Sequence, residues 1–158
     1  MRGKKIFAAL LAAALLALAL TGCGGKTATP NATTASYEEM VAWLTQEGYI
    51  SEQAQPVDIN TTEGYVTDNT GGQFSTAVLA DKAEDYDGLW LFWWDLENPT
   101  DNYEVYQNMK VNDGTMMVDG GAAVLQSAAR NGAYAIAFAP DYPQQEDVVA
   151  AFEALPSE

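Results

Sequence analysis

The chain has 158 residues, with 22 acidic side chains against 7 basic ones, one cysteine and no histidine. Without histidine, the Ser-His-Asp and Cys-His catalytic arrangements and the histidine-rich zinc sites of hydrolases are excluded. A single cysteine excludes a disulfide within the chain. The net charge of −15 argues against nucleic acid as a partner, because phosphate repels so acidic a surface.

The N-terminal residues have the layout of a bacterial export signal. Arg2, Lys4 and Lys5 precede an apolar run over residues 6–20, which ends at Thr21 and Gly22. A helix that spans a bilayer comfortably needs about twenty residues. The shorter run therefore predicts a removable signal over residues 1–22 rather than a permanent span.

Residues Leu20-Thr21-Gly22-Cys23 resemble the lipobox of bacterial lipoproteins, in which an aliphatic residue and two small residues precede the modified cysteine. The resemblance implies cleavage before Cys23 and a diacylglyceryl group on its thiol. That group supplies the two acyl chains that stable anchoring requires. We therefore expect a protein anchored by lipid to the outer, extracytoplasmic face of the cell membrane.

Residues 23–35 are rich in Gly, Thr, Ala and Pro and have no apolar period, which predicts a flexible tether. Residues 36–158 are enough for one compact domain. After cleavage the chain keeps four cations against 22 acids, a net charge of −18. An anionic membrane surface is expected to repel so acidic a domain.

Two or three helices are predicted. Ser36 and Glu39 form a capping box at the start of an amphipathic helix that Gly48 ends. Asp101 is positioned to cap a helix that begins at Asn102, although a strand over the same residues also fits. The last helix has Pro143 in its first turn, followed by an apolar stripe of Val148, Val149, Phe152 and Leu155.

Residues 88–96 are the most apolar segment after the signal and predict a central buried strand. Alternation divides its large side chains into Leu89, Leu91 and Trp93 on one face and Trp90, Phe92, Trp94 and Leu96 on the other. Both faces therefore need a covering layer.

A hairpin over residues 122–139 is predicted around a turn at Asn131-Gly132, although a helix before the turn also fits. After the turn, Tyr134, Ile136 and Phe138 alternate with alanines, which leaves one face flat. Short strands are expected at 115–118 and within 50–87, where a functional loop is the alternative. Together these elements predict an α+β domain in which a sheet packs against helices.

The segment Asp85-Tyr86-Asp87-Gly88 resembles the middle of a calcium-binding loop. The first and twelfth positions of that loop would be Ala83 and Trp94, so the EF-hand interpretation fails and a turn is expected instead. We expect no metal site and no cofactor.

Aromatic and acidic side chains gather between residues 93 and 103. Trp94, Asp95, Glu97 and Tyr103 combine aromatic surface with carboxylates, as many sugar-binding and glycan-cleaving sites do. A glycosidase needs two carboxyl groups at a set separation, which the sequence does not define. The same acids also suit a strand end and a helix start, so a capping role is the alternative.

A second candidate recognition site is the polar segment 65–72. Tyr65, Asp68 and Asn69 offer hydrogen-bond donors and acceptors there beside two glycines. Turn chemistry accounts for the same residues, so a turn without a binding role is the alternative.

Two stretches of the domain, YVTDNTGG at 65–72 and YDGLWLFWWDLENP at 86–99, are similar to small lipoproteins of anaerobic Gram-positive bacteria. That resemblance implies no activity and assigns no site residue. We expect a binding or interaction module whose surface ligand is a glycan or a protein, with no catalytic residue assigned. A carboxylate-based glycan hydrolase and a structural envelope protein are the alternatives.

Overall fold

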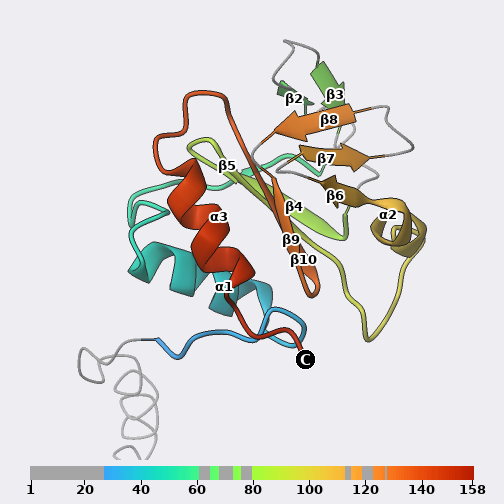
Figure 1. The fold of residues 1–158 in the computed structure, drawn as a ribbon, viewed down its shortest axis with the longest axis horizontal. Coiled ribbons are helices and arrows are strands. Elements are labelled where there is room, and N and C mark those ends of the chain that lie inside the picture. Colours follow the sequence, from blue (N-terminus) through green and yellow to red (C-terminus); the bar gives the residue numbers. More distant parts are fainter. Residues whose placement is uncertain are drawn as a thin grey trace, which may run out of the picture.

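The structure, a computed structural model, describes residues 27–60, 65–67, 73–75, 80–112, 115–118, 123–126 and 128–158. It confirms the predicted α+β class, because a five-stranded antiparallel sheet packs with three helices in one small domain (Figure 1). The predicted signal peptide and Cys23 lie outside the described residues.

The main sheet has the strand order β1-β4-β5-β10-β9. Its strands are β1 (Val57–Asp58), β4 (Lys82–Tyr86), β5 (Leu89–Trp93), β9 (Ala129–Asn131) and β10 (Tyr134–Phe138). A separate pair consists of β2 (Tyr65–Thr67) and β3 (Gln73–Ser75), and a three-stranded sheet consists of β6 (Lys110–Asn112), β7 (Thr115–Val118) and β8 (Ala123–Gln126). The region 50–87 therefore contains the short strands that were predicted.

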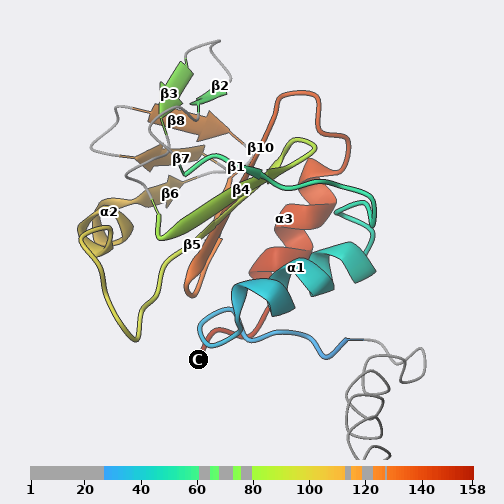
Figure 2. The ribbon, with the colours of Figure 1, turned by 180° about the vertical axis from the view of Figure 1, so that it is seen from behind.

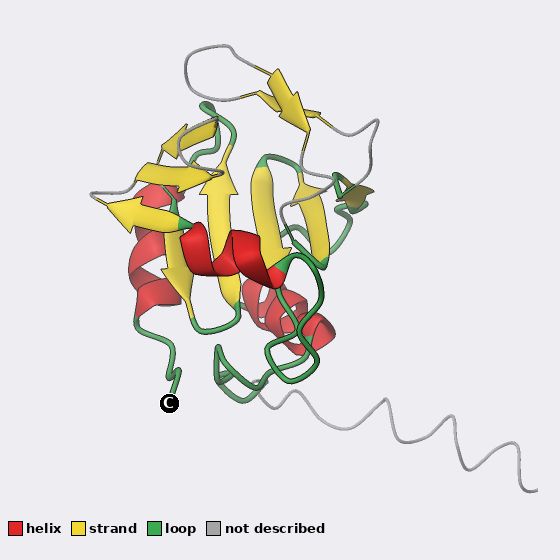
Figure 3. Ribbon diagram, turned by 90° about the vertical axis from the view of Figure 1, so that its right-hand side faces the viewer, coloured by secondary structure: helices red, strands yellow, loops and turns green. Residues whose placement is uncertain are grey.

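The central strand β5 is buried on both faces, as its alternation predicted. Leu89 and Leu91 join a core with helices α1 (Tyr37–Gln46) and α3 (Gln145–Glu153), and Trp90, Phe92 and Trp94 join a second core on the other face. Helix α2 (Tyr103–Asn108) lies on that second side, away from α1 and α3 (Figures 2 and 3). The sheet is thus the middle of three layers.

Helix α1 begins and ends where the sequence predicted. The Ser36 hydroxyl accepts the Glu39 N–H at 3.3 Å, and the Glu39 carboxylate accepts the Ser36 N–H at 2.8 Å, which completes the capping box. Gly48, with φ of 81°, follows the helix end. Trp43 is 5% exposed and belongs to the core.

The turn between β4 and β5 uses two residues with positive φ, Asp87 at 53° and Gly88 at 99°. The Asp85 carboxylate accepts the Gly88 N–H at 2.7 Å across this turn. The segment that resembles part of a calcium loop is therefore a tight hairpin turn, as expected.

The hairpin predicted over 122–139 is shorter in the structure. Its first arm is β9, and its two loop residues are Gly132 and Ala133, because Asn131 already pairs with Tyr134. Residues 123–126 form β8 and pair with β7 instead. These two strands are close in the chain, so their pairing closes only a short loop.

Helix α2 confirms the helical interpretation of residues 102–109, but its predicted cap is wrong. Asn102 is the N-cap residue, and its side chain makes no cap hydrogen bond. Asp101 is exposed one residue earlier. Helix α3 starts at Gln145, so Pro143 precedes the first turn that it was predicted to occupy.

Residues 30–35, which the sequence assigned to the tether, pack against the domain; we call them the N-terminal strap. Pro30 and Ala32 are buried, and the Ala32 backbone is hydrogen bonded to Ala133 and Pro156. Composition does not reveal such backbone pairing, which is why the boundary was placed too late. The packed domain begins at Pro30 rather than at Ser36.

Candidate functional site

A polar network lies beyond the end of β5 and centres on Asp81. Its carboxylate accepts hydrogen bonds from the Asp95 N–H at 2.8 Å, from the Asn102 amide at 3.2 Å and from the Thr100 hydroxyl. The Asn102 amide also donates to the Ala80 carbonyl at 2.9 Å. This one carboxylate therefore holds together both ends of the segment 95–102.

Asp95 stabilises a turn at the start of the same segment. Its carboxylate accepts the Glu97 N–H at 3.0 Å, the Asn98 N–H at 2.9 Å and the Asn98 amide at 3.2 Å. The backbone hydrogen bond from Asn98, with smaller effects of the Asn98 side chain and Glu97, holds the pKa of Asp95 below its usual value. A general acid needs a raised pKa, so Asp95 suits a turn and not that catalytic role.

Trp94, a predicted ligand contact, is 1% exposed and belongs to the second core. Its ring lies 5.5 Å from the ring of Tyr106 and 6.4 Å from that of Phe92. A side chain buried to this extent offers no surface for a ligand to stack on. Trp94 is therefore a core residue, and its burial does not favour the predicted ligand contact.

Tyr103 stays at the surface end of an aromatic stack. Its ring is nearly parallel to the Tyr106 ring, at 5.7 Å between centroids and an angle of 15°. The Arg130 guanidinium lies 3.9 Å from the Tyr106 ring centroid and donates to the carbonyls of Tyr106 and Met109. These bonds satisfy carbonyls at the end of α2 and lock the stack that supports the half-buried Tyr103.

Residues 95–104 comprise the connection after β5 and the first two residues of α2, and we call them the loop of residues 95–104. They contain four acids and no base. Glu97, Asp101 and Glu104 are exposed. Of the predicted contacts, the structure thus brings Asp95, Glu97 and Tyr103 into one fixed segment and removes Trp94 from its surface. Asp68 and Asn69 lie outside the described residues, as does the side-chain environment of Tyr65.

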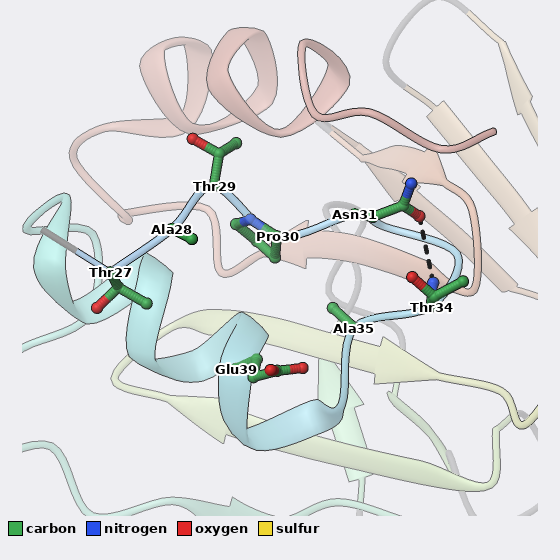
Figure 4. A pocket seen from close by; sticks show the side chains of 8 residues that line it. All are labelled: Thr27, Ala28, Thr29, Pro30, Asn31, Thr34, Ala35 and Glu39. Carbon is green, nitrogen blue, oxygen red and sulfur yellow. Dashed lines mark hydrogen bonds between the residues drawn. The ribbon is translucent and has the colours of Figure 1, made fainter.

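Two surface pockets lie beside helices. One, of about 440 Å³, is lined by residues 27–31, Thr34, Ala35 and Glu39, between the N-terminal segment and α1 (Figure 4). Glu39 is the one ionisable residue in that lining, and its carboxylate is engaged in the helix cap. The other pocket, of about 380 Å³, is lined by residues 142–147 at the start of α3.

The sequence did not single out the residues that organise the loop. Asp81, Asn102 and Arg130 each bond to backbone groups 14 to 24 residues away. No spacing motif connects positions that far apart, so only the fold brings them together.

Among the residues that the structure describes, no cluster of three or more Cys, Asp, Glu or His side chains is arranged to hold a metal ion. In the same part of the chain, no helix is long and apolar enough to cross a bilayer. Comparison with protein-family models, curated proteins and solved structures finds no match for this chain.

Proposed function

We propose that the protein is a lipid-anchored, extracytoplasmic binding module that recognises a surface ligand through the loop of residues 95–104. The observation that carries this proposal is the loop itself. The Asp81 network holds its backbone, while Glu97, Asp101 and Glu104 are exposed beside Tyr103. A loop held in this way loses little conformational entropy on binding, so its groups are preorganised for a ligand.

The chemistry of the loop favours a glycan or a protein as ligand. Carboxylates accept hydrogen bonds from sugar hydroxyls and pair with cationic side chains. The ring of Tyr103 adds an apolar surface with a polar tip, which suits either class. The hydrolase alternative needs a general acid, and Asp95 does not suit that role, because its pKa is lowered and its carboxylate is occupied by the turn.

The binding proposal is tested by measuring thermal unfolding of the lipidated protein in detergent against a panel of glycans and peptides. A ligand at about 100 times its dissociation constant adds about 2.7 kcal/mol to the free energy of unfolding. A shift identifies the ligand class. If every member of both classes leaves the unfolding temperature unchanged, the binding proposal fails and a structural envelope role takes its place.

The site is tested by paired variants in the same assay. Tyr103→Ala and Glu97→Gln are expected to abolish or weaken the ligand-induced shift. Glu153→Gln removes one exposed carboxylate from α3 and serves as the charge-matched control, for which the shift should persist. An equal loss in all three variants would point to net charge rather than to the loop.

The anchor is tested separately with Cys23→Ala. The variant is expected to leave the membrane fraction, because it lacks the thiol that receives the diacylglyceryl group. If it sediments with membranes as completely as the parent, the lipoprotein assignment is wrong.

A further inference from the structure

The N-terminal strap is hydrogen bonded on two sides to segments that lie far from it in the chain. The Ala32 N–H donates to the Pro156 carbonyl at 2.6 Å, and the Ala32 carbonyl accepts the Ala133 N–H at 2.8 Å. The side chain of Ala32 is completely buried. The strap thus lies between the hairpin turn and the C-terminal tail, with Ala32 hydrogen bonded to both through its backbone.

Further bonds hold both ends of the strap. The Thr33 hydroxyl donates to the Ser157 carbonyl at 2.7 Å, and the Asn31 amide donates to the Glu158 carbonyl at 3.1 Å. Beyond Ala32, the Tyr134 hydroxyl donates to the Ala35 carbonyl at 2.7 Å. The Asn131 amide donates to the Phe152 and Leu155 carbonyls, both at 2.9 Å. These bonds connect the hairpin to the end of α3 and the start of the C-terminal tail that binds the strap.

Gly132 makes this docking possible. A Cβ atom at this position would lie 2.4 Å from the carbonyl carbon and oxygen of Ala32 and 2.6 Å from the Thr33 nitrogen. These are backbone atoms, which cannot move aside without displacing the strap. The glycine therefore serves the contact between hairpin and strap as well as the turn.

We propose that the strap is an orienting device, which fixes one end of the domain as the point where the anchored chain leaves it and thereby favours one surface pointing away from the membrane. This inference rests on the proposed lipid anchor at Cys23. A tether that stayed loose up to Ser36 would let the domain reach about 45 Å from the lipid, whereas docking at Pro30 shortens the reach to about 25 Å.

The strap lies at one of the two ends of the main sheet. The strap and residues 156–158 lie together at the end of the sheet that carries the β9–β10 turn, whereas the connection from β10 to α3 lies at the opposite end (Figures 1 and 2). The Ala139 N–H bonds there to the Gly88 carbonyl at 2.8 Å. Because the shorter tether leaves the domain at the first end, the anchored protein is expected to keep that end nearer the membrane than the second, on average.

Hydrogen exchange tests the docking itself in the full lipidated protein. In Gly132→Ala, amide exchange over residues 31–36 is expected to rise about tenfold, because the strap opens while the core persists. Gly48→Ala is the matched control, since Gly48 also has positive φ but a Cβ there meets no atom within 4 Å. Asn31→Ala provides a second way to loosen the strap, through the loss of its bonds to Thr33, Thr34 and Glu158.

Energy transfer in vesicles tests the orientation. The lipidated cysteine carries no thiol, so a dye attached at Ser157→Cys or at Asp141→Cys is unique, and both side chains are exposed. With an acceptor dye in phosphatidylcholine vesicles, transfer from position 157 is expected to exceed transfer from 141. The difference should disappear in Gly132→Ala or Asn31→Ala and persist in Gly48→Ala.

The outcomes separate this inference from the anchor on which it depends. Equal transfer from the two positions in the parent protein, or unchanged exchange in both strap variants, overturns the orienting role while the anchor stands. If the protein does not associate with vesicles and Cys23→Ala behaves like the parent, the anchor fails and the orienting role fails with it.

Discussion

On the helix side of the main sheet, large side chains meet large side chains, whereas on the other side the aromatic residues of β5 lie beside alanines. Leu91 pairs with Ile136 beneath α1 and α3. Phe92, on the opposite face, has Ala83 and Ala135 as its cross-strand neighbours. Around Leu91 the volume is therefore shared by large side chains of neighbouring elements, whereas the two strands that flank Phe92 contribute only alanines at its level.

This difference implies that the two faces respond differently to mutation. When several elements share a core, their side chains can shift to fill part of a cavity. Alanines have no rotamers with which to fill a gap left by an aromatic neighbour. A large-to-small substitution should therefore cost more stability on the second face than on the first.

Phe92→Ala is expected to have the largest effect, a loss of about 4 kcal/mol in the free energy of unfolding. Its flanking alanines cannot fill the cavity. Leu91→Ala, the neighbouring position on the other face, should cost less, about 3 kcal/mol. Urea unfolding of the two variants measures both values, and a larger loss for Leu91→Ala would contradict the proposed difference between the faces.

Ala135→Leu tests the same packing from the opposite strand. The added side chain must displace the ring of Phe92, which we expect to cost about 1 to 3 kcal/mol of unfolding free energy. In the double variant with Phe92→Ala the new leucine occupies the vacated space, so the combined loss should be smaller than the sum. Additive losses would mean that the two positions do not share one cavity.

Alkaline pH should weaken the helix side through its buried tyrosines. Burial raises the pKa of the Tyr134 hydroxyl above its usual value of 10.0. The unfolded chain then releases this proton first, so the contribution of Tyr134 to stability is constant below pH 10 and falls above it by about 1.4 kcal/mol per pH unit. Urea unfolding between pH 8 and 11 should show a shallower decline for Tyr134→Phe, and an equal slope would refute this role.

Asp85 and Asp95, near opposite ends of β5, should have the smallest effects on stability. Their contributions should change in opposite directions with pH. Burial raises the pKa of Asp85, so its contribution to stability falls as the pH rises through and above 3.8. The Asn98 bonds lower the pKa of Asp95, so its contribution is present above pH 3.8 and is lost as the pH falls below it.

Asn substitutions measure these contributions. At pH 7, Asp95→Asn is expected to be less stable than the parent, with the gap closing in acid. Asp85→Asn should become more stable relative to the parent as the pH rises, because the amide avoids the cost of a buried charge. Thermal unfolding from pH 3 to 7 detects both trends, and parallel curves for the two variants would show that the shifts do not control stability.

The loop of residues 95–104 shows how far the candidate site was predictable. Its acids and Tyr103 were recognised from composition, and Asp95 matched the alternative of a strand-end cap. The burial of Trp94 was not recognised, because alternation assigns a residue to a face without saying what covers that face. Asp81, which organises the loop, has no local signal in the sequence.

The sequence by itself determined the elements whose causes are local. The capping box of α1, the turn at Asp87-Gly88 and the two buried faces of β5 follow from neighbours a few residues apart. Tertiary structure alone decided that the strap docks on Pro156. The strap's partners lie about a hundred or more residues away, and backbone hydrogen bonds between them carry no side-chain signature that a sequence displays.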